Sequence, residues 1–146
     1  MFVRHEAEFP WDGGRGSGPQ QPPDPLPPHL RDLLWCLRRT AMLRPLGQGR
    51  DAHVHLLLQR GFGDGGLGLE HLLRCLVVGL ARRAARPIHL HQPCRPQISD
   101  DEWRLLTGLA EAARPDRVAA VLAPLVGSRG AELAPVLAGI AALLPR

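Results

Sequence analysis

Two histidines and a cysteine lie within six residues of one another in a proline-rich segment. The segment reads Pro87-Ile88-His89-Leu90-His91-Gln92-Pro93-Cys94-Arg95-Pro96-Gln97-Ile98. Alternate side chains of an extended chain point to the same side, so His89 and His91 would face one ligand together. Zinc binds neutral imidazole and thiolate, with four protein ligands in a structural site or three and a water in a catalytic one. The sequence therefore indicates a candidate zinc site of His53, His89, His91 and Cys94.

The same segment also has a purely structural interpretation. None of these spacings is a recognised zinc pattern, and the chain contains no His-Glu-x-x-His. A histidine beside proline in a connection commonly hydrogen-bonds a backbone carbonyl or caps a helix. Cys94, next to Arg95, stands where positive charge favours a reactive thiolate, so a thiol-dependent role is a further alternative. Cys36 and Cys75 fall on apolar helical faces, and we expect both in the core.

A glycine cluster precedes the longest apolar run and matches G-x-G-x-x-G through Gly61, Gly63 and Gly66. A dinucleotide site needs a strand before this loop and an acidic residue about 20 positions beyond it, to hold the ribose. No carboxylate stands about 20 to 30 residues after Gly66. Glycines at helix ends need no other cause, so we expect an interhelical loop. Strands at Val54–Gln59 and Ile88–His91 would instead indicate a nucleotide enzyme.

No other catalytic set can be assembled from the sequence. There is no Gly-x-Ser-x-Gly, and Ser99 is explained as the first residue of a capping box with Glu102. The chain has no lysine, which excludes a P-loop and Schiff-base chemistry. Asp100 and Asp101 suit the first turn of a helix without any catalytic duty. We therefore expect a binding or regulatory module without cofactor rather than an enzyme, the metal- or thiol-dependent protein being the alternative.

All 18 basic residues are arginine, against 14 acidic residues. Abundant Arg, Gly, Pro and Ala, without Lys, Asn or Tyr, are also typical of a GC-rich genome, which reduces the weight of the charge. Four arginines nevertheless form a candidate partner-binding edge: Arg82, Arg83, Arg86 and Arg95. Aromatic residues for base stacking are lacking near them, so nucleic acid is not the expected partner. We expect an acidic protein surface or a second copy of the chain.

The expected location is the cytoplasm. The three cysteines form no CxxC pair, and the N-terminus lacks the apolar run of a signal peptide. The two longest apolar stretches, Leu67–Ala85 and Val118–Leu144, are both interrupted by charged residues. A bilayer needs about 20 predominantly apolar residues in a row. We therefore expect no membrane partner.

Composition divides the chain into an arm and a body. Residues 1–28 carry seven prolines and four glycines without a periodic apolar pattern, and predict a disordered arm. Two arginines against four acidic residues give the arm a charge of −2, and sixteen against ten give residues 29–146 a charge of +6. The body predicts an all-α fold, a single compact bundle of about six helices. The expected helices are about His29–Leu43, a helix capped by Asp51 that runs to Gly61, about Leu67–Ala85, Ser99 to about Ala113, a helix from Pro115 that is stopped by Gly127 and Gly130, and about Ala131–Leu144.

Several landmarks resemble those of a small bacterial all-helical family catalogued only as a domain of unknown function. They are Arg38-Arg39 in the first expected helix, Asp51-Ala52-His53, the Pro93-Cys94 turn and the pair Asp101-Glu102. The resemblance extends from Leu30 to about Leu106 and implies a helical fold without an established activity. The family's turn reads Pro-Cys-Cys-Pro-Arg, whereas this chain has a single cysteine there. This departure argues against carrying over a vicinal-thiol or metal role.

Overall fold

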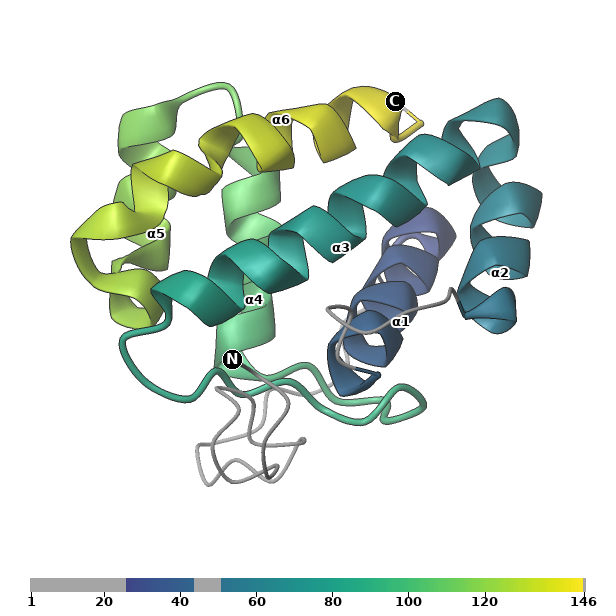
Figure 1. Ribbon diagram of the computed structural model, residues 1–146, viewed down its shortest axis with the longest axis horizontal. Helices are drawn as coiled ribbons and strands as arrows, with labels where there is room; N and C mark the ends of the chain where they lie inside the picture. Colours follow the sequence, from purple (N-terminus) through teal and green to yellow (C-terminus); the bar gives the residue numbers. More distant parts are fainter. Residues whose placement is uncertain (1–25, 44–50, 146) are drawn as a thin grey trace.

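Helices form almost all the regular structure of residues 26–43 and 51–145, which are the part of the chain that the computed structural model describes (Figure 1). The expected all-α class is confirmed for these two ranges, which contain no strand, although Ile88 and Ile98 form an isolated bridge. The expected arm lies outside the described residues except for its last three. Of these, Leu26 packs against the core and Pro28 already belongs to the first helix.

The helices follow the apolar periodicity and the caps of the sequence. Their bounds are α1 Pro28–Met42, α2 Ala52–Phe62, α3 Gly66–Arg83, α4 Asp100–Ala110, α5 Pro115–Val126 and α6 Ala134–Leu143, with 3-10 turns η2 at Gly63–Gly65 and η3 at Gly127–Leu133. Asp51 caps α2 by accepting the His53 amide, and Ser99 caps α4 through a complete capping box with Glu102. Val54–Gln59 is therefore helical, which removes the strand that a nucleotide enzyme needed there.

The long helix α3 lies across the middle of the described structure, with α6 beside it and α1 and α2 against its N-terminal half (Figure 1). Its inner face is fully buried at Leu69, Leu73, Val77 and Leu80. Each such leucine contributes about 1.5–3 kcal/mol by leaving water. The outer face of α3 is different, because His71 is exposed there. α3 is therefore buried along its inner face and reaches solvent on its outer face.

The glycine cluster is the turn between α2 and α3. Gly63 has a φ of +57°, a backbone conformation that is strained for a residue with a side chain. Gly66 opens α3 so close to α2 that a Cβ there would lie 2.7 Å from the carbonyl oxygen of Leu58. The glycines therefore serve a tight crossing of two helices, as the loop interpretation predicts.

The stretch Pro115–Leu143 is long and apolar enough by composition to cross a membrane, and 39% of its apolar 18-residue window is buried inside the protein. It does not form one straight helix. α5 ends where Gly127 takes a φ of +62°, η3 packs back on α5, and α6 starts in a new direction (Figure 1). Gly130 makes this return possible, since a Cβ there would lie 2.9 Å from the Cα of Ala119.

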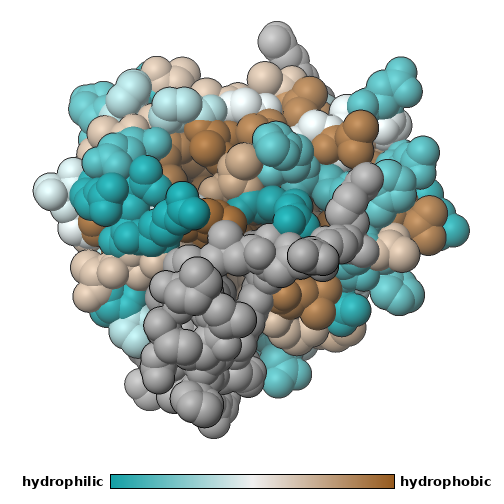
Figure 2. All heavy atoms as spheres, viewed as in Figure 1, coloured by the Kyte–Doolittle hydropathy of each residue, from teal (hydrophilic) through white to brown (hydrophobic). Residues whose placement is uncertain are grey.

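The face that carries α3 and α6 mixes apolar and polar residues instead of presenting one continuous apolar surface (Figure 2). Large apolar side chains are exposed at scattered positions in the described ranges, namely Met42, Leu43, Leu56, Leu67 and Leu143. Single exposed apolar residues of this kind are normal on a protein surface.

Candidate functional site

Residues 84–99 connect α3 to α4 and form the least regular described segment, which we call the elbow. Prolines 87, 93 and 96 prevent helix formation along it. Its inner side is held by apolar residues, since Ile88, Leu90 and Ile98 are almost completely buried. At its start, the amide of Ala85 donates to the carbonyl of Leu125 on α5. The elbow is thus packed against the core along one side.

A single buried arginine supports the elbow from behind. Arg38, on the core-facing side of α1, is only 4% exposed, and its guanidinium donates to carbonyl oxygens of the elbow. The shortest of these bonds run from Nη1 to the carbonyl of Arg95 at 2.8 Å and from Nη2 to that of Gln97 at 2.7 Å. Longer ones reach Pro93 at 3.3 Å and Gln92 at 3.5 Å. The planar donor fork of arginine suits this cradle, which a lysine could not fill.

The charge of Arg38 is balanced by Glu102 in the first turn of α4. The two side chains form a bidentate pair, with Nε–Oε2 at 2.7 Å and Nη2–Oε1 at 2.8 Å, and Glu102 is fully buried. The carboxylate also accepts the amides of His91 and Ser99. A buried charge is tolerated when it is paired and its remaining hydrogen-bonding capacity is used, as it is here. Glu102 therefore joins α1, the elbow and the cap of α4.

A second carboxylate fastens the first half of the elbow. Asp101 accepts two hydrogen bonds from Arg86, one from Arg104 and one from the amide of His89. Burial acts to raise the pKa of Asp101, but the hydrogen bonds from Arg86 and the His89 amide, with the charges of Arg86 and Arg104, hold it below its ordinary value. Ser99 adds a further tie, because its hydroxyl donates to the carbonyl of His89. Asp101 and Glu102, both in the first turn of α4, therefore hold the elbow in place.

The tip of the elbow points away from these supports. A turn closes where the amide of Arg95 donates to the carbonyl of Gln92 at 3.0 Å. Gln92, Cys94, Arg95 and Pro96 are exposed, although the backbone beneath them is held by Arg38. The result is a loop whose backbone is held from behind and whose tip side chains are exposed.

The structure brings together two of the four expected metal ligands. The rings of His89 and His91 lie edge to face with centroids 4.7 Å apart, and His91 is buried. Cys94 is exposed at the tip, and His53 is exposed in the first turn of α2. Across residues 26–43 and 51–145, no group of three or more His, Cys, Asp or Glu side chains is arranged to hold a metal ion.

The four arginines of the expected partner-binding edge differ in their surroundings. Arg86 is committed to Asp101, and Arg83 pairs with Glu132 at 2.9 Å while donating to the carbonyl of Gly79. Arg82 is exposed at the end of α3. Arg95 is exposed at the tip of the elbow and donates from Nε to the side-chain oxygen of Gln97 at 3.4 Å. Arg83 and Arg86 are therefore already paired with carboxylates of the same chain.

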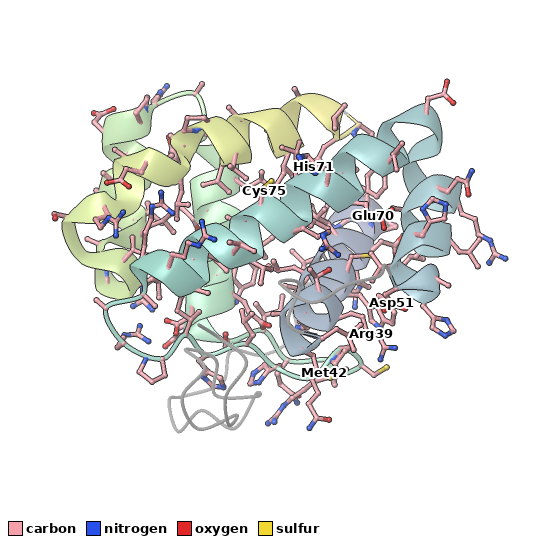
Figure 3. All side chains as sticks on the ribbon, in the orientation of Figure 1. Arg39, Met42, Asp51, Glu70, His71 and Cys75 are labelled. Carbon is pink, nitrogen blue, oxygen red and sulfur yellow. The ribbon has the colours of Figure 1, made fainter. Side chains whose placement is uncertain are left out.

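A second polar cluster lies between α1, α2 and α3. Arg39 pairs with Asp51 at 2.6 Å, and His55 Nδ1 lies 2.9 Å from the carboxylate of buried Glu70 (Figure 3 labels Arg39, Asp51 and Glu70). Burial, with the negative charges of Asp32, Asp51 and Glu70, raises the pKa of the Cys36 thiol to about 12. Cys36 is thus an inert core residue, as expected. Cys75 departs from the same expectation, because it is partly exposed.

A small apolar cavity between α1, α3, α4 and α6 has a volume of about 20 Å³. It is lined entirely by leucine and isoleucine side chains, namely Leu33, Leu34, Leu37, Leu73, Leu76, Leu105, Leu106, Leu109, Leu137 and Ile140. This volume is close to that of one water molecule, so the cavity is a packing defect and not a ligand site.

The sequence marks the elbow by its composition but not the residues that build it. Arg38 stands out there only as part of a double arginine, and Glu102 only as a cap and as one of an acidic pair. One signal was available, because Arg38 lies four residues after Leu34 and three before Ala41, on the buried face of α1. No family model, curated protein or solved structure matches the chain, so the site is interpreted from its geometry.

Proposed function

We propose that the protein is a binding module that recognises an acidic segment of a protein partner through the tip of the elbow. One observation carries this proposal. A buried ion pair, Arg38 with Glu102, fixes the backbone of a loop whose own tip contributes no side chain to the core. Replacing such a pair by apolar residues is often neutral or stabilising, so general stability does not account for it.

A loop held in one conformation binds with little loss of conformational entropy. Binding residues are also disproportionately found on loops positioned by a rigid scaffold. The elbow has this character, because Arg38 and Asp101 fasten its two halves while Gln92, Cys94 and Arg95 face outward. Its geometry therefore favours recognition.

Charge supports an acidic partner. The tip carries Arg95, and Arg82 is exposed at the end of the preceding helix. Arginine makes planar, bidentate hydrogen bonds with carboxylates, which suits an Asp- or Glu-rich peptide. No acidic side chain lies between residues 84 and 99, so the elbow presents no competing negative charge of its own.

The landmarks of the family resemblance support a shared elbow. Arg38, the Pro93-Cys94 turn and the pair Asp101-Glu102 are linked by the hydrogen bonds described above. We propose that the family positions its turn in the same way. The cytoplasmic location and the disordered arm stay predictions.

Crosslinking in the native host tests the function. A photoactivatable amino acid replaces Gln92 at the tip or, as the control, Gln59 on the exposed side of α2. We expect discrete adducts with one protein from position 92 only, which Arg95→Glu abolishes and the matched Arg60→Glu leaves intact. Identical adducts from both positions, no adduct from position 92, or adducts insensitive to Arg95→Glu would refute the proposal.

A further inference from the structure

The outer face of α3 carries a histidine and a cysteine that touch each other. His71 and Cys75 lie on consecutive turns, four residues apart, so their side chains share one face of the helix (Figure 3). The Sγ atom of Cys75 lies 3.6 Å from Nε2 of His71. His71 is exposed and Cys75 is partly exposed, so both are open to a ligand from solvent.

We propose that His71 and Cys75 form a two-ligand site for a divalent cation of the zinc class. Zinc–sulfur bonds are about 2.3 Å long and zinc–nitrogen bonds about 2.0–2.1 Å, and the ligands stand at tetrahedral angles. Two such ligands on one zinc ion lie about 3.6 Å apart by this geometry. The separation of Sγ and Nε2, 3.6 Å, matches that value.

The helix holds the pair in place from the opposite side. Leu69, Leu73 and Leu80 are at most 1% exposed and fix the backbone of α3 in the core. Metal binding therefore orders only two side chains, so the loss of conformational entropy is small. The thiol of Cys75 releases its proton to solvent as the metal–sulfur bond forms, and His71 binds through its neutral imidazole.

The remaining coordination positions of the ion are open. No third His, Cys, Asp or Glu of residues 26–43 and 51–145 joins the pair in a metal-binding group. Water fills these positions in a single molecule. The site is consequently an exchangeable one, unlike a closed structural site with four protein ligands.

The chain contains its own control for this proposal. Cys94, at the tip of the elbow, is the other thiol in the described ranges that solvent reaches. The fully buried Cys36 is inaccessible. A zinc site on α3 therefore predicts sensitivity to changes at positions 71 and 75 and indifference to the same change at position 94. This proposal is independent of the elbow, which uses none of these α3 residues.

Zinc binding to the reduced, untagged full chain tests the site by calorimetry, with cobalt absorption as a second readout of thiolate coordination. We expect one ion per chain and at least about tenfold weaker binding in His71→Ala and in Cys75→Ser, since even the outer partners of metal ligands are worth about 10–100-fold. Cys94→Ser should bind like the wild type. Circular dichroism verifies that each variant is folded.

Each result decides the matter. Half an ion per chain, with the same sensitivity at positions 71 and 75, supports the ligand assignment, with a second copy's pair filling the open positions. Failure of the wild-type chain to bind zinc overturns the proposal. So does binding that survives Cys75→Ser and disappears in Cys94→Ser, which would place the ion at the elbow.

Discussion

Replacement of Arg38 by methionine removes the guanidinium while keeping a side chain of similar length. The four elbow carbonyls lose a donor, but their hydrogen bonds are only partly buried, so water replaces part of that loss. Water cannot replace the lost guanidinium at the carboxylate of Glu102, because this side chain is fully buried. Breaking a buried pair in this way typically costs about 3–5 kcal/mol. We expect Arg38→Met to lower the free energy of unfolding by that amount.

The double variant Arg38→Met/Glu102→Gln separates the ion pair from the loss of packing. The neutral amide oxygen of the new glutamine can still accept one of the two backbone amides, from His91 or Ser99. We expect the double variant to be more stable than the sum of the single changes implies, by about 0.5–3 kcal/mol.

Urea unfolding followed by circular dichroism measures all three variants against the wild type. A whole domain is stable by about 5–15 kcal/mol, so Arg38→Met should remain measurable. A cost below about 1 kcal/mol, the range of a solvent-exposed pair, would contradict the role given to Arg38. Strict additivity in the double variant would equally refute the reasoning.

Three further predictions follow from contacts outside that pair. The pKa of Asp101 is lowered in the folded protein, so its stabilising contribution is present above the pKa of an unfolded aspartate, about 3.9, and is lost as the pH falls through the lower folded value. Asp101→Asn should therefore cost about 1–2 kcal/mol near pH 7 and flatten the acid limb of a pH-dependent urea series. An unchanged acid limb would contradict this prediction. Iodoacetamide at pH 8 should label Cys94 and Cys75 in the folded chain. Cys36, with a pKa of about 12, should be labelled only after unfolding, which peptide mass spectrometry measures. Labelling of Cys36 in the folded chain would refute its burial. Gly127→Ala should destabilise the protein by about 1–3 kcal/mol in thermal melts, because Gly127 has a φ of +62°. Gly61→Ala should be neutral or stabilising, because Gly61 lies inside α2 and the nearest atom is 3.7 Å from the new Cβ. Equal effects at the two glycines would contradict the strain assigned to Gly127.

Much of the helical architecture was predictable because its signals are local. Ser99 and Asp51 cap the helices that they were expected to cap, and Gly127 ends α5. Ends were less certain. The last helix begins at Ala134 and not at Ala131, because η3 takes the intervening residues into a 3-10 turn.

The candidate site was only half predictable, because its parts are distant in sequence. The proline-rich segment marks the elbow by composition alone. Its main supports, Arg38 and Glu102, are 64 residues apart, and no periodic pattern links an arginine to one particular carboxylate at that distance. Cys75 was assigned to the core because α3 is apolar around most of its circumference, and the sequence could not show which side of such a helix faces solvent.

The separation of Arg38 from Glu102 also constrains how the chain can be made. During synthesis α1 leaves the ribosome well before α4 exists, so the guanidinium of Arg38 has no carboxylate to meet. Until then it must stay hydrated, because an unpaired charge is too costly to bury. The apolar face that surrounds Arg38 on α1 therefore stays partly wet in the nascent chain, and the elbow takes its final form only after translation has passed Glu102.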